Sequence, residues 1–173
     1  MNLNEFKSSA LEGGGARANL FEVQGSIGGA NADRDLSFLC KSASLPPSDI
    51  GEIVVPWRGR QFKMPGDKTF GDWEITIISD AAWRLRGNFE AWMNQFNSHA
   101  TNVSKVKGIV PNLFQDWTMR LLDREGSNLR EYTLVGCWPK SVGEIAMAMD
   151  SNDSLAEFSV TMTYQWWESP STN

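Results

Sequence analysis

The sequence predicts a mainly β domain, a β-sandwich or a rolled β-barrel of about seven strands, with one α-helix packed against its flank. Three observations predict this class. Short segments that alternate apolar and polar side chains recur along the chain, which is typical of strands with one buried face. One segment, 81–98, repeats its apolar residues with a helical period instead. Proline, glycine and acidic residues between these segments indicate turns.

The composition fits one folded domain. A chain of 173 residues with 41% hydrophobic and 21% charged side chains buries roughly 70% of its unfolded surface, which is enough for its own core. We expect a mobile arm over residues 1–18, a single β domain over 19–168 and a short tail over 169–173. No signal peptide is visible and no apolar run approaches the roughly 20 residues of a membrane span. We therefore expect a protein that is assembled in a cytoplasm and has no membrane partner.

The first strands of the predicted sheet are short. Alternation predicts a strand over 19–24, and a loop rich in Gly, Ala, Asn and Asp follows over 25–35. A second strand over 37–45 ends before Pro46 and Pro47, because proline lacks the amide donor that a strand ladder needs. The chain therefore turns after this strand.

A hairpin comes next, and after it a strand with two distinct faces. Segments 52–55 and 60–64 form the hairpin arms around Pro56-Trp57-Arg58-Gly59, where glycine tolerates a positive φ. The strand over 70–79 alternates strictly in its middle. It directs Trp73, Ile75 and Ile77 to the core, and Asp72, Glu74 and Thr76 to water.

The predicted helix follows this strand directly. Ser79 or Asp80 can cap its first turn. Its apolar stripe consists of Leu85, Phe89, Trp92, Met93 and Phe96. Burying the stripe against the sheet stabilises the domain by on the order of 10 kcal/mol as an upper bound.

Three more strands complete the predicted sheet. One covers 116–124, and the next covers 128–138 and stops at Pro139. The last strand, 158–166, has the clearest alternation. On it Phe158, Val160, Met162, Tyr164 and Trp166 alternate with Ser159, Thr161, Thr163 and Gln165.

The sequence has no pattern typical of catalysis or of metal binding. His99 is the single histidine and has no second His or Cys at ligand spacing. Cys40 and Cys137 form no CxxC pair and are expected to be buried thiols. The segment 150–154 begins like a calcium loop, but Leu155 occupies the position of its glycine. We therefore expect no catalytic residue, no metal and no cofactor, and a protein that is not an enzyme.

Eight tryptophans leave two interpretations open. Four fall on faces assigned to the core: Trp73, Trp92, Trp117 and Trp166. The other four do not: Trp57, Trp83, Trp138 and Trp167. These are either anchors of a protein interface or an aromatic platform for sugar rings, in which case the chain is a carbohydrate-binding module.

The charge distribution points to self-association and away from DNA binding. Residues 1–115 carry twelve acids and twelve bases, whereas residues 116–173 carry nine acids and four bases, so the net charge of −5 lies in the last third. Such a chain lacks the clustered bases that grip phosphates. The segment 57–68 is locally basic, with Arg58, Arg60, Lys63 and Lys68 against Asp67. It is either a solvated loop or a device that docks onto an acidic surface of an identical neighbour.

Several linked motifs, in this order, resemble the tail tube protein family of contractile-tailed bacteriophages. The motifs are Cys40-Lys-Ser-Ala-Ser-Leu-Pro-Pro47, Glu52-Ile-Val-Val-Pro-Trp-Arg-Gly-Arg60, Gly66-Asp67, Trp73-Glu-Ile-Thr-Ile-Ile-Ser-Asp80, Phe89-Glu-Ala-Trp-Met-Asn-Gln-Phe-Asn-Ser-His99 and Leu155-Ala-Glu-Phe-Ser-Val-Thr-Met-Thr-Tyr-Gln-Trp-Trp-Glu168. The resemblance implies a homohexameric ring in a virion tail, and rings that stack into a tube inside a contractile sheath. Sheath, baseplate and tail terminator proteins are the implied partners, and DNA passes through without specific binding. The tube protein of a contractile injection or secretion system and a baseplate tube initiator are the alternatives.

Together, the strand faces and the resemblance predict residue roles. The lumen is lined by Asp72, Glu74, Thr76, Glu157, Ser159, Thr161, Thr163 and Gln165. The hairpin reaches the next ring through Glu52, Trp57, Arg58, Arg60, Lys63 and Lys68. The outer helix, with Arg84, Arg86 and Glu90, faces the sheath. The acidic balance favours DNA passage, because repulsion keeps phosphates from being held.

Overall fold

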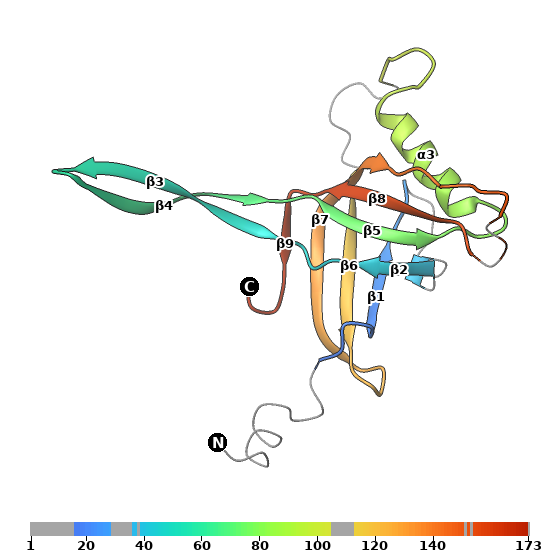
Figure 1. Ribbon diagram of the computed structural model, residues 1–173, viewed down its shortest axis with the longest axis horizontal. Helices are drawn as coiled ribbons and strands as arrows, with labels where there is room; N and C mark the ends of the chain where they lie inside the picture. Colours follow the sequence, from blue (N-terminus) through green and yellow to red (C-terminus); the bar gives the residue numbers. More distant parts are fainter. Residues whose placement is uncertain are drawn as a thin grey trace.

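The computed structural model describes residues 16–28, 36–37, 39–104, 113–150, 152 and 154–172. Within them the chain forms nine strands and one long helix, α3 (Figure 1). Their bounds are β1 Phe21–Gly25, β2 Cys40–Ala43, β3 Ser48–Trp57, β4 Arg60–Phe70, β5 Trp73–Ile78, α3 Arg84–Phe96, β6 Gln115–Leu122, β7 Asn128–Val142, β8 Glu157–Thr163 and β9 Trp166–Glu168.

Seven strands form one rolled antiparallel sheet. Its order is β1-β6-β7-β8-β5-β2, and β9 pairs with β7. The long strand β7 connects two halves of the sheet that cross each other in Figure 1, because it pairs with β6 up to Cys137 and with β8 from Trp138 onward. Gly136 lies at this change of partner with φ 67°, a conformation that favours glycine. The predicted class, a mainly β rolled sheet of about seven strands with one flanking helix, is confirmed.

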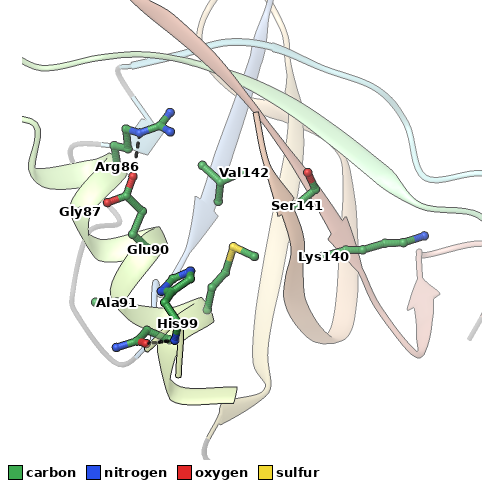
Figure 2. A pocket seen from close by; sticks show the side chains of 10 residues that line it. Arg86, Gly87, Glu90, Ala91, His99, Lys140, Ser141 and Val142 are labelled. Carbon is green, nitrogen blue, oxygen red and sulfur yellow. Dashed lines mark hydrogen bonds and ion pairs between the residues drawn. The ribbon is translucent and has the colours of Figure 1, made fainter. Parts of the chain in front are cut away.

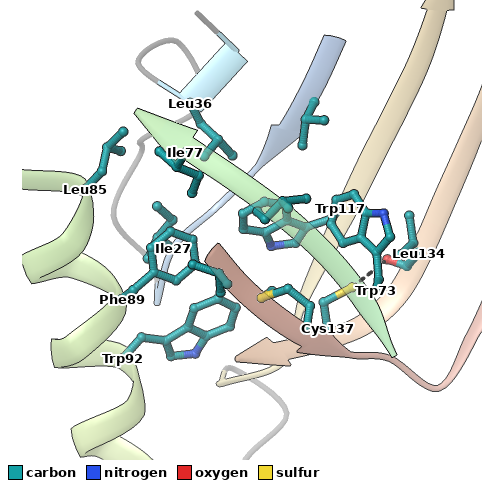
Figure 3. Packing of buried hydrophobic residues seen from close by; sticks show 14 of the residues in the cluster. Ile27, Leu36, Trp73, Ile77, Leu85, Phe89, Trp92, Trp117, Leu134 and Cys137 are labelled. Carbon is teal, nitrogen blue, oxygen red and sulfur yellow. Dashed lines mark hydrogen bonds between the residues drawn. The ribbon is translucent and has the colours of Figure 1, made fainter. Parts of the chain in front are cut away.

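The core fills the space between the two halves of the sheet and α3. Trp73 of β5 packs edge-on against Trp117 of β6, with ring centroids 5.9 Å apart. Phe89 of α3 approaches Trp117 at 6.1 Å and Phe158 of β8 at 6.4 Å. Figure 3 shows Phe89 and Trp92 pointing from the helix toward Trp117. These contacts confirm the predicted inward positions of Trp73, Trp117 and Phe158, and of Phe89 and Trp92 on the helix.

The predicted first half of the chain needs three corrections. The strand expected over 37–45 is reduced to β2, because residues 36, 37 and 39 are helical. The hairpin is longer than expected, because β3 and β4 stay paired from the tip to Ser48 and Phe70. Residues 48–51 therefore belong to β3 and do not form a turn. The strand expected over 70–79 is split at residues 71–72 between β4 and β5.

The last strands also differ from the prediction. β7 does not stop at Pro139 but continues to Val142, and its pairing with β8 has a register shift between Pro139 and Ser141, an irregularity of the kind at which strands tolerate proline. The final strand ends at Thr163, and the Gln165 amide donates to the Val135 carbonyl at 2.9 Å. This bend starts β9 and leaves Trp166 45% exposed, so the prediction of a buried Trp166 is wrong.

The helix begins later than predicted, at Arg84. Trp83 precedes it with a left-handed φ of 56° and provides no side-chain cap. Asp80 still serves the first turn, because its Oδ1 accepts a hydrogen bond from the Leu85 amide at 3.4 Å. Of the predicted stripe, Leu85, Phe89 and Trp92 are buried. No helix in the described part of the chain is long and apolar enough to span a bilayer.

Some sequence predictions fall on residues that the structure does not describe. Residues 1–15 of the predicted arm and residues 29–35 of the predicted glycine-rich loop lie outside the described residues. At the other end, residues 169–172 form a turn in which Ser169 is buried and its amide donates to Thr172 Oγ1 at 2.8 Å. The domain boundaries at 18 and 168 stay predictions.

Candidate assembly surfaces

The first candidate surface is the outer face of β5 and β8. Register pairs Glu74 with Thr161 and Thr76 with Ser159, and these side chains alternate with the buried residues of both strands. Asp72 joins this face, because Thr163 Oγ1 donates to its Oδ1 at 3.0 Å. Seven of the predicted lumen residues therefore share one polar surface that points away from the core: Asp72, Glu74, Thr76, Glu157, Ser159, Thr161 and Thr163. Gln165 lies beyond β8, in the bend before β9.

Two lysines that the sequence analysis did not place complete this polar face. Lys41 of β2 contacts Glu157, with Nζ and Oε2 2.6 Å apart. Lys140 of β7 contacts Asp72, with Nζ and Oδ2 also 2.6 Å apart. The face is therefore a mixed network of acids, bases and hydroxyls. Cross-strand neighbours bring the lysines there, and short-range alternation alone does not show such neighbours.

The network also sets the acidity of one carboxyl. Hydrogen bonds from Lys140 and Thr163 hold the pKa of Asp72 below its usual range, because both stabilise the charged form. The pair is well exposed, with 55% of the lysine side chain and 41% of the aspartate side chain accessible. Such pairs stabilise a fold by about 0–1 kcal/mol. The main effect of the network is therefore on the charge of this face, and its contribution to the stability of the subunit is small.

The second candidate surface is the β3–β4 hairpin, which extends away from the rolled sheet (Figure 1). Its tip is a tight turn in which Arg58 and Gly59 have φ 46° and 81°, as expected for a two-residue connection that matches strand twist. Every residue of β3 is exposed. The hairpin is a separate two-stranded sheet in the described structure, and such a ribbon is marginally stable by itself.

The two faces of the hairpin differ in chemistry. The cross-strand pairs Val55 with Phe62 and Ile53 with Met64 lie on one face, and Trp57 opposite Arg60 continues it at the tip. Trp57 is 67% and Phe62 60% exposed. We call the set Ile53, Val55, Trp57, Phe62 and Met64 the apolar hairpin face. Sequence reasoning identified the charges of this segment but missed this face, because Val54 and Pro56 on the opposite side hide its alternation.

The predicted charged residues of the hairpin occupy different places along it. Glu52 and Lys63 form an ion pair within the hairpin, at 3.0 Å. The Arg58 guanidinium lies over the Trp57 ring at 5.3 Å. Lys68 lies at the root, over the rings of Phe70 at 5.4 Å and of Trp167 at 5.7 Å. Arg58 and Arg60 thus remain as the cations at the tip.

The third candidate surface is α3 with the groove beside it. An open groove of about 600 Å³ separates the helix from the end of β7. Figure 2 shows Arg86, Glu90, His99 and Lys140 around it. Arg86 Nε contacts Glu90 Oε1 at 2.8 Å, and Arg86 Nη1 donates to the Gly143 carbonyl at 2.9 Å.

The groove offers no pair of groups free for acid–base chemistry. Its carboxylate is paired with Arg86, and Lys140 is paired with Asp72. Arg84, on the first turn of the helix, contacts Asp80 at 3.2 Å. The described residues contain no cluster of three metal-ligating side chains. Burial raises the pKa of the Cys40 thiol to about 11 and that of Cys137 to about 12, as expected for unreactive thiols.

The tryptophans do not form one platform. Trp73, Trp92 and Trp117 are fully buried. Trp138 packs against Phe96 and Trp167 against Tyr132. The exposed indoles are spread over the molecule, with Trp57 at the hairpin tip and Trp83 before α3.

The comparison with known families decides which class of protein carries these surfaces. The family model described as phage tail tube protein matches residues 15–169. The chain belongs to the phage tail tube protein family. It is a structural subunit of a phage tail tube, and the carbohydrate-binding interpretation is set aside.

Individual tail tube proteins agree over nearly the whole chain. The tail tube protein of Serratia phage KSP90 is 29% identical over 167 residues, which cover 94% of this chain and 93% of that protein. Tail tube protein gp19 of Enterobacteria phage T4 is 32% identical over 155 residues, which cover 88% and 91%. The fold is similar to a solved sheath/tube terminator of an extracellular contractile injection system, PVC, with a TM-score of 0.66 and 17% identity over 90% of this chain and 96% of that one.

Proposed function

We propose that this tail tube subunit forms hexameric rings that stack into a hollow tube within a contractile sheath, and that DNA passes through the tube without being bound. The observation that carries the proposal is the apolar hairpin face, on which Ile53, Val55, Trp57, Phe62 and Met64 are all exposed in the isolated subunit. Soluble monomers rarely expose such a contiguous patch unless a partner covers it. A neighbouring copy in the tube is the partner that the family supplies.

Ring formation follows from the sheet edges. β1 and β2 are the outer strands of the described sheet order, and β2 is only four residues long. Unpaired strand edges favour strand addition, and closure of a ring covers them. We therefore place the contacts within a ring at the two ends of the rolled sheet.

The lumen is assigned to the polar outer face of β5 and β8. The face combines hydroxyls with Asp72, Glu74 and Glu157, and Lys41 and Lys140 neutralise part of this charge. A surface without clustered bases gives DNA phosphates few sites to displace counterions. DNA would therefore slide through without being held.

The remaining surfaces receive the other partners. The hairpin tip, with Trp57, Arg58 and Arg60, reaches the next ring. The outer side of α3, with Arg84, Arg86 and Glu90, faces the sheath. Baseplate and tail terminator proteins cover the ends of the tube. The subunits are assembled in the host cytoplasm, carry no cofactor and catalyse no reaction.

Electron microscopy of the purified protein tests the assembly. We expect rings, or tubes of stacked rings, whose smallest assembled unit has six times the subunit mass of 19.3 kDa. A protein that stays monomeric at high concentration contradicts the proposal. Single rings that never stack would instead indicate a tube initiator that needs a baseplate.

Thiol labelling of assembled tubes tests the lumen and the outer helix together. Thr161→Cys places a thiol on the polar face, and Glu90→Cys is the matched control on α3. A maleimide that carries a long polyethylene glycol chain should label both variants before assembly. After assembly it should label only Glu90→Cys, since the polymer does not enter a narrow lumen. Equal labelling of both variants in tubes contradicts the lumen assignment.

A further inference from the structure

The structure has a second exposed apolar surface, at the end of the molecule opposite the hairpin tip. The segment 143–156 connects β7 to β8, and its described residues, 143–150, 152 and 154–156, run beside the start of α3 at the far end of the long axis (Figure 1). Met147, Met149 and Leu155 on it are exposed, and Met149 is fully accessible. We call this segment, together with the turn 79–83, the end surface.

The end surface is a fixed part of the fold where it meets the sheet. The Ser79 amide donates to the Ala156 carbonyl at 2.8 Å, which joins the two segments. The Gly143 amide donates to the Ser159 carbonyl at 2.7 Å, and Arg86 contacts the Gly143 carbonyl. Both ends of the segment are therefore anchored, while Met147 and Met149 between them are exposed.

The end surface and the hairpin tip have complementary charge. The described residues of segment 143–156 include Glu144 and Asp150 and no base. The hairpin tip carries Arg58 and Arg60 and no acid. Each surface also presents apolar side chains beside its charges: an aromatic ring on the tip, and flexible methionines on the end surface that can adapt to a ring. Opposite charges around an apolar centre are the usual arrangement of a specific protein contact.

Their positions at opposite ends of one molecule determine what the contact builds. Two different, complementary patches on one chain make a head-to-tail contact, and repetition of that contact produces an open array and not a closed pair. We infer that the hairpin tip of a subunit in one ring binds the end surface of a subunit in the next ring, with Trp57 against Met147 and Met149, and with Arg58 and Arg60 near Glu144 and Asp150. This inference rests on the proposed ring stacking and names the surface that receives the hairpin.

A disulfide scan tests the contact directly. Trp57→Cys combined with Met149→Cys should form intersubunit disulfides on mild oxidation of assembled tubes, because the bond requires Cα atoms within about 7 Å. Trp57→Cys with Leu129→Cys is the matched control, since Leu129 is also exposed but lies at the start of β7. Denaturing gels should show covalent chains longer than six subunits for the first pair and monomers for the second.

Several outcomes would overturn the inference. Tubes of the 57/149 variant that yield only monomers, covalent chains that stop at six subunits, or equal cross-linking of the 57/129 control would each do so. Chains that stop at six would place the contact within a ring. An unmodified protein that forms no rings or tubes would instead contradict the proposed function, so the two failures are distinguishable.

A charge exchange decides the case if the cysteine pair fails to assemble. Arg58→Glu with Arg60→Glu, and separately Glu144→Arg with Asp150→Arg, should each lower the polymerised fraction by about tenfold or more, because like charges then face each other. Combining all four substitutions should restore tubes, because the charges are again opposite. A fourfold variant that polymerises no better than either parent contradicts the inference.

Discussion

The rolled sheet and the β3–β4 hairpin each have an apolar face, but only the apolar face of the rolled sheet is buried within the subunit. On β8, every second residue is buried in the subunit core, as Phe158, Val160 and Met162 show. On the hairpin, Ile53 and Val55 likewise share one face of β3, yet both are exposed. The sheet therefore obtains its hydrophobic stabilisation within one chain, whereas the hairpin can obtain it only from another chain. A period of two predicts that a face will be buried but does not say by which molecule.

Matched phenylalanine truncations should separate these two regions most strongly. Phe89→Ala removes a ring that packs against Trp92, Trp117 and Phe158, and it should lower the free energy of unfolding by about 3–5 kcal/mol. Phe62→Ala removes an exposed ring of the hairpin, and it should change the unfolding free energy by less than about 0.5 kcal/mol. Urea unfolding of unassembled subunits measures both values.

Tube assembly should show the reverse ranking: among subunits that remain folded, Phe62→Ala should impair assembly more than Phe89→Ala. Phe62→Ala should raise the protein concentration needed for tube formation, measured by sedimentation. If Phe62→Ala destabilised the isolated subunit as much as Phe89→Ala does, the hairpin would be part of the subunit core and the comparison would fail.

Two glycines test how tightly the subunit core is packed, with a smaller expected effect on stability. A Cβ on Gly25 would lie 2.3 Å from the buried Trp117 ring, so Gly25→Ala should destabilise the subunit by about 1–3 kcal/mol through overpacking. Gly87 on α3 is the matched control, because a Cβ there meets nothing within 4 Å. Gly87→Ala should stabilise the helix by up to about 1 kcal/mol. Thermal unfolding of both variants gives the sign, and a neutral Gly25→Ala would indicate a more deformable core.

The sequence predicts the subunit core better than the assembly surfaces, for identifiable reasons. The inner faces of β5, β6 and β8 and the stripe of α3 follow from local periodicity, because one face of each element is buried. The continuation of β7 past Pro139 does not follow, since it depends on a register shift against β8. The ion pairs of Lys41 and Lys140 depend on strand neighbours that are distant in sequence. The predicted site residues could thus be assigned to faces, but their partners required the tertiary structure.

The smallest expected effect concerns the polar face of the sheet, and it depends on pH. Lys140 and Thr163 hold the pKa of Asp72 below its usual value, which is about 3.9 in an unfolded chain. The folded subunit therefore binds this proton less readily than the unfolded chain does. The resulting stabilisation is complete above the unfolded pKa and is lost as the pH falls through the folded pKa.

Asp72→Asn should therefore cost less than about 1 kcal/mol of unfolding free energy near neutral pH, since the pair is exposed and screened. The difference from the unmodified subunit should disappear at a pH well below about 4, and added salt should reduce it at neutral pH. Glu74→Gln is the matched control, because Glu74 lies on the same face and makes no ion pair with any described residue. A difference that persists unchanged in acid, or a Glu74→Gln variant with the same pH profile, would show that Lys140 does not stabilise the folded subunit through Asp72. The lysine would then act only by lowering the negative charge of the face, and its contribution would be measured in the tube and not in the subunit.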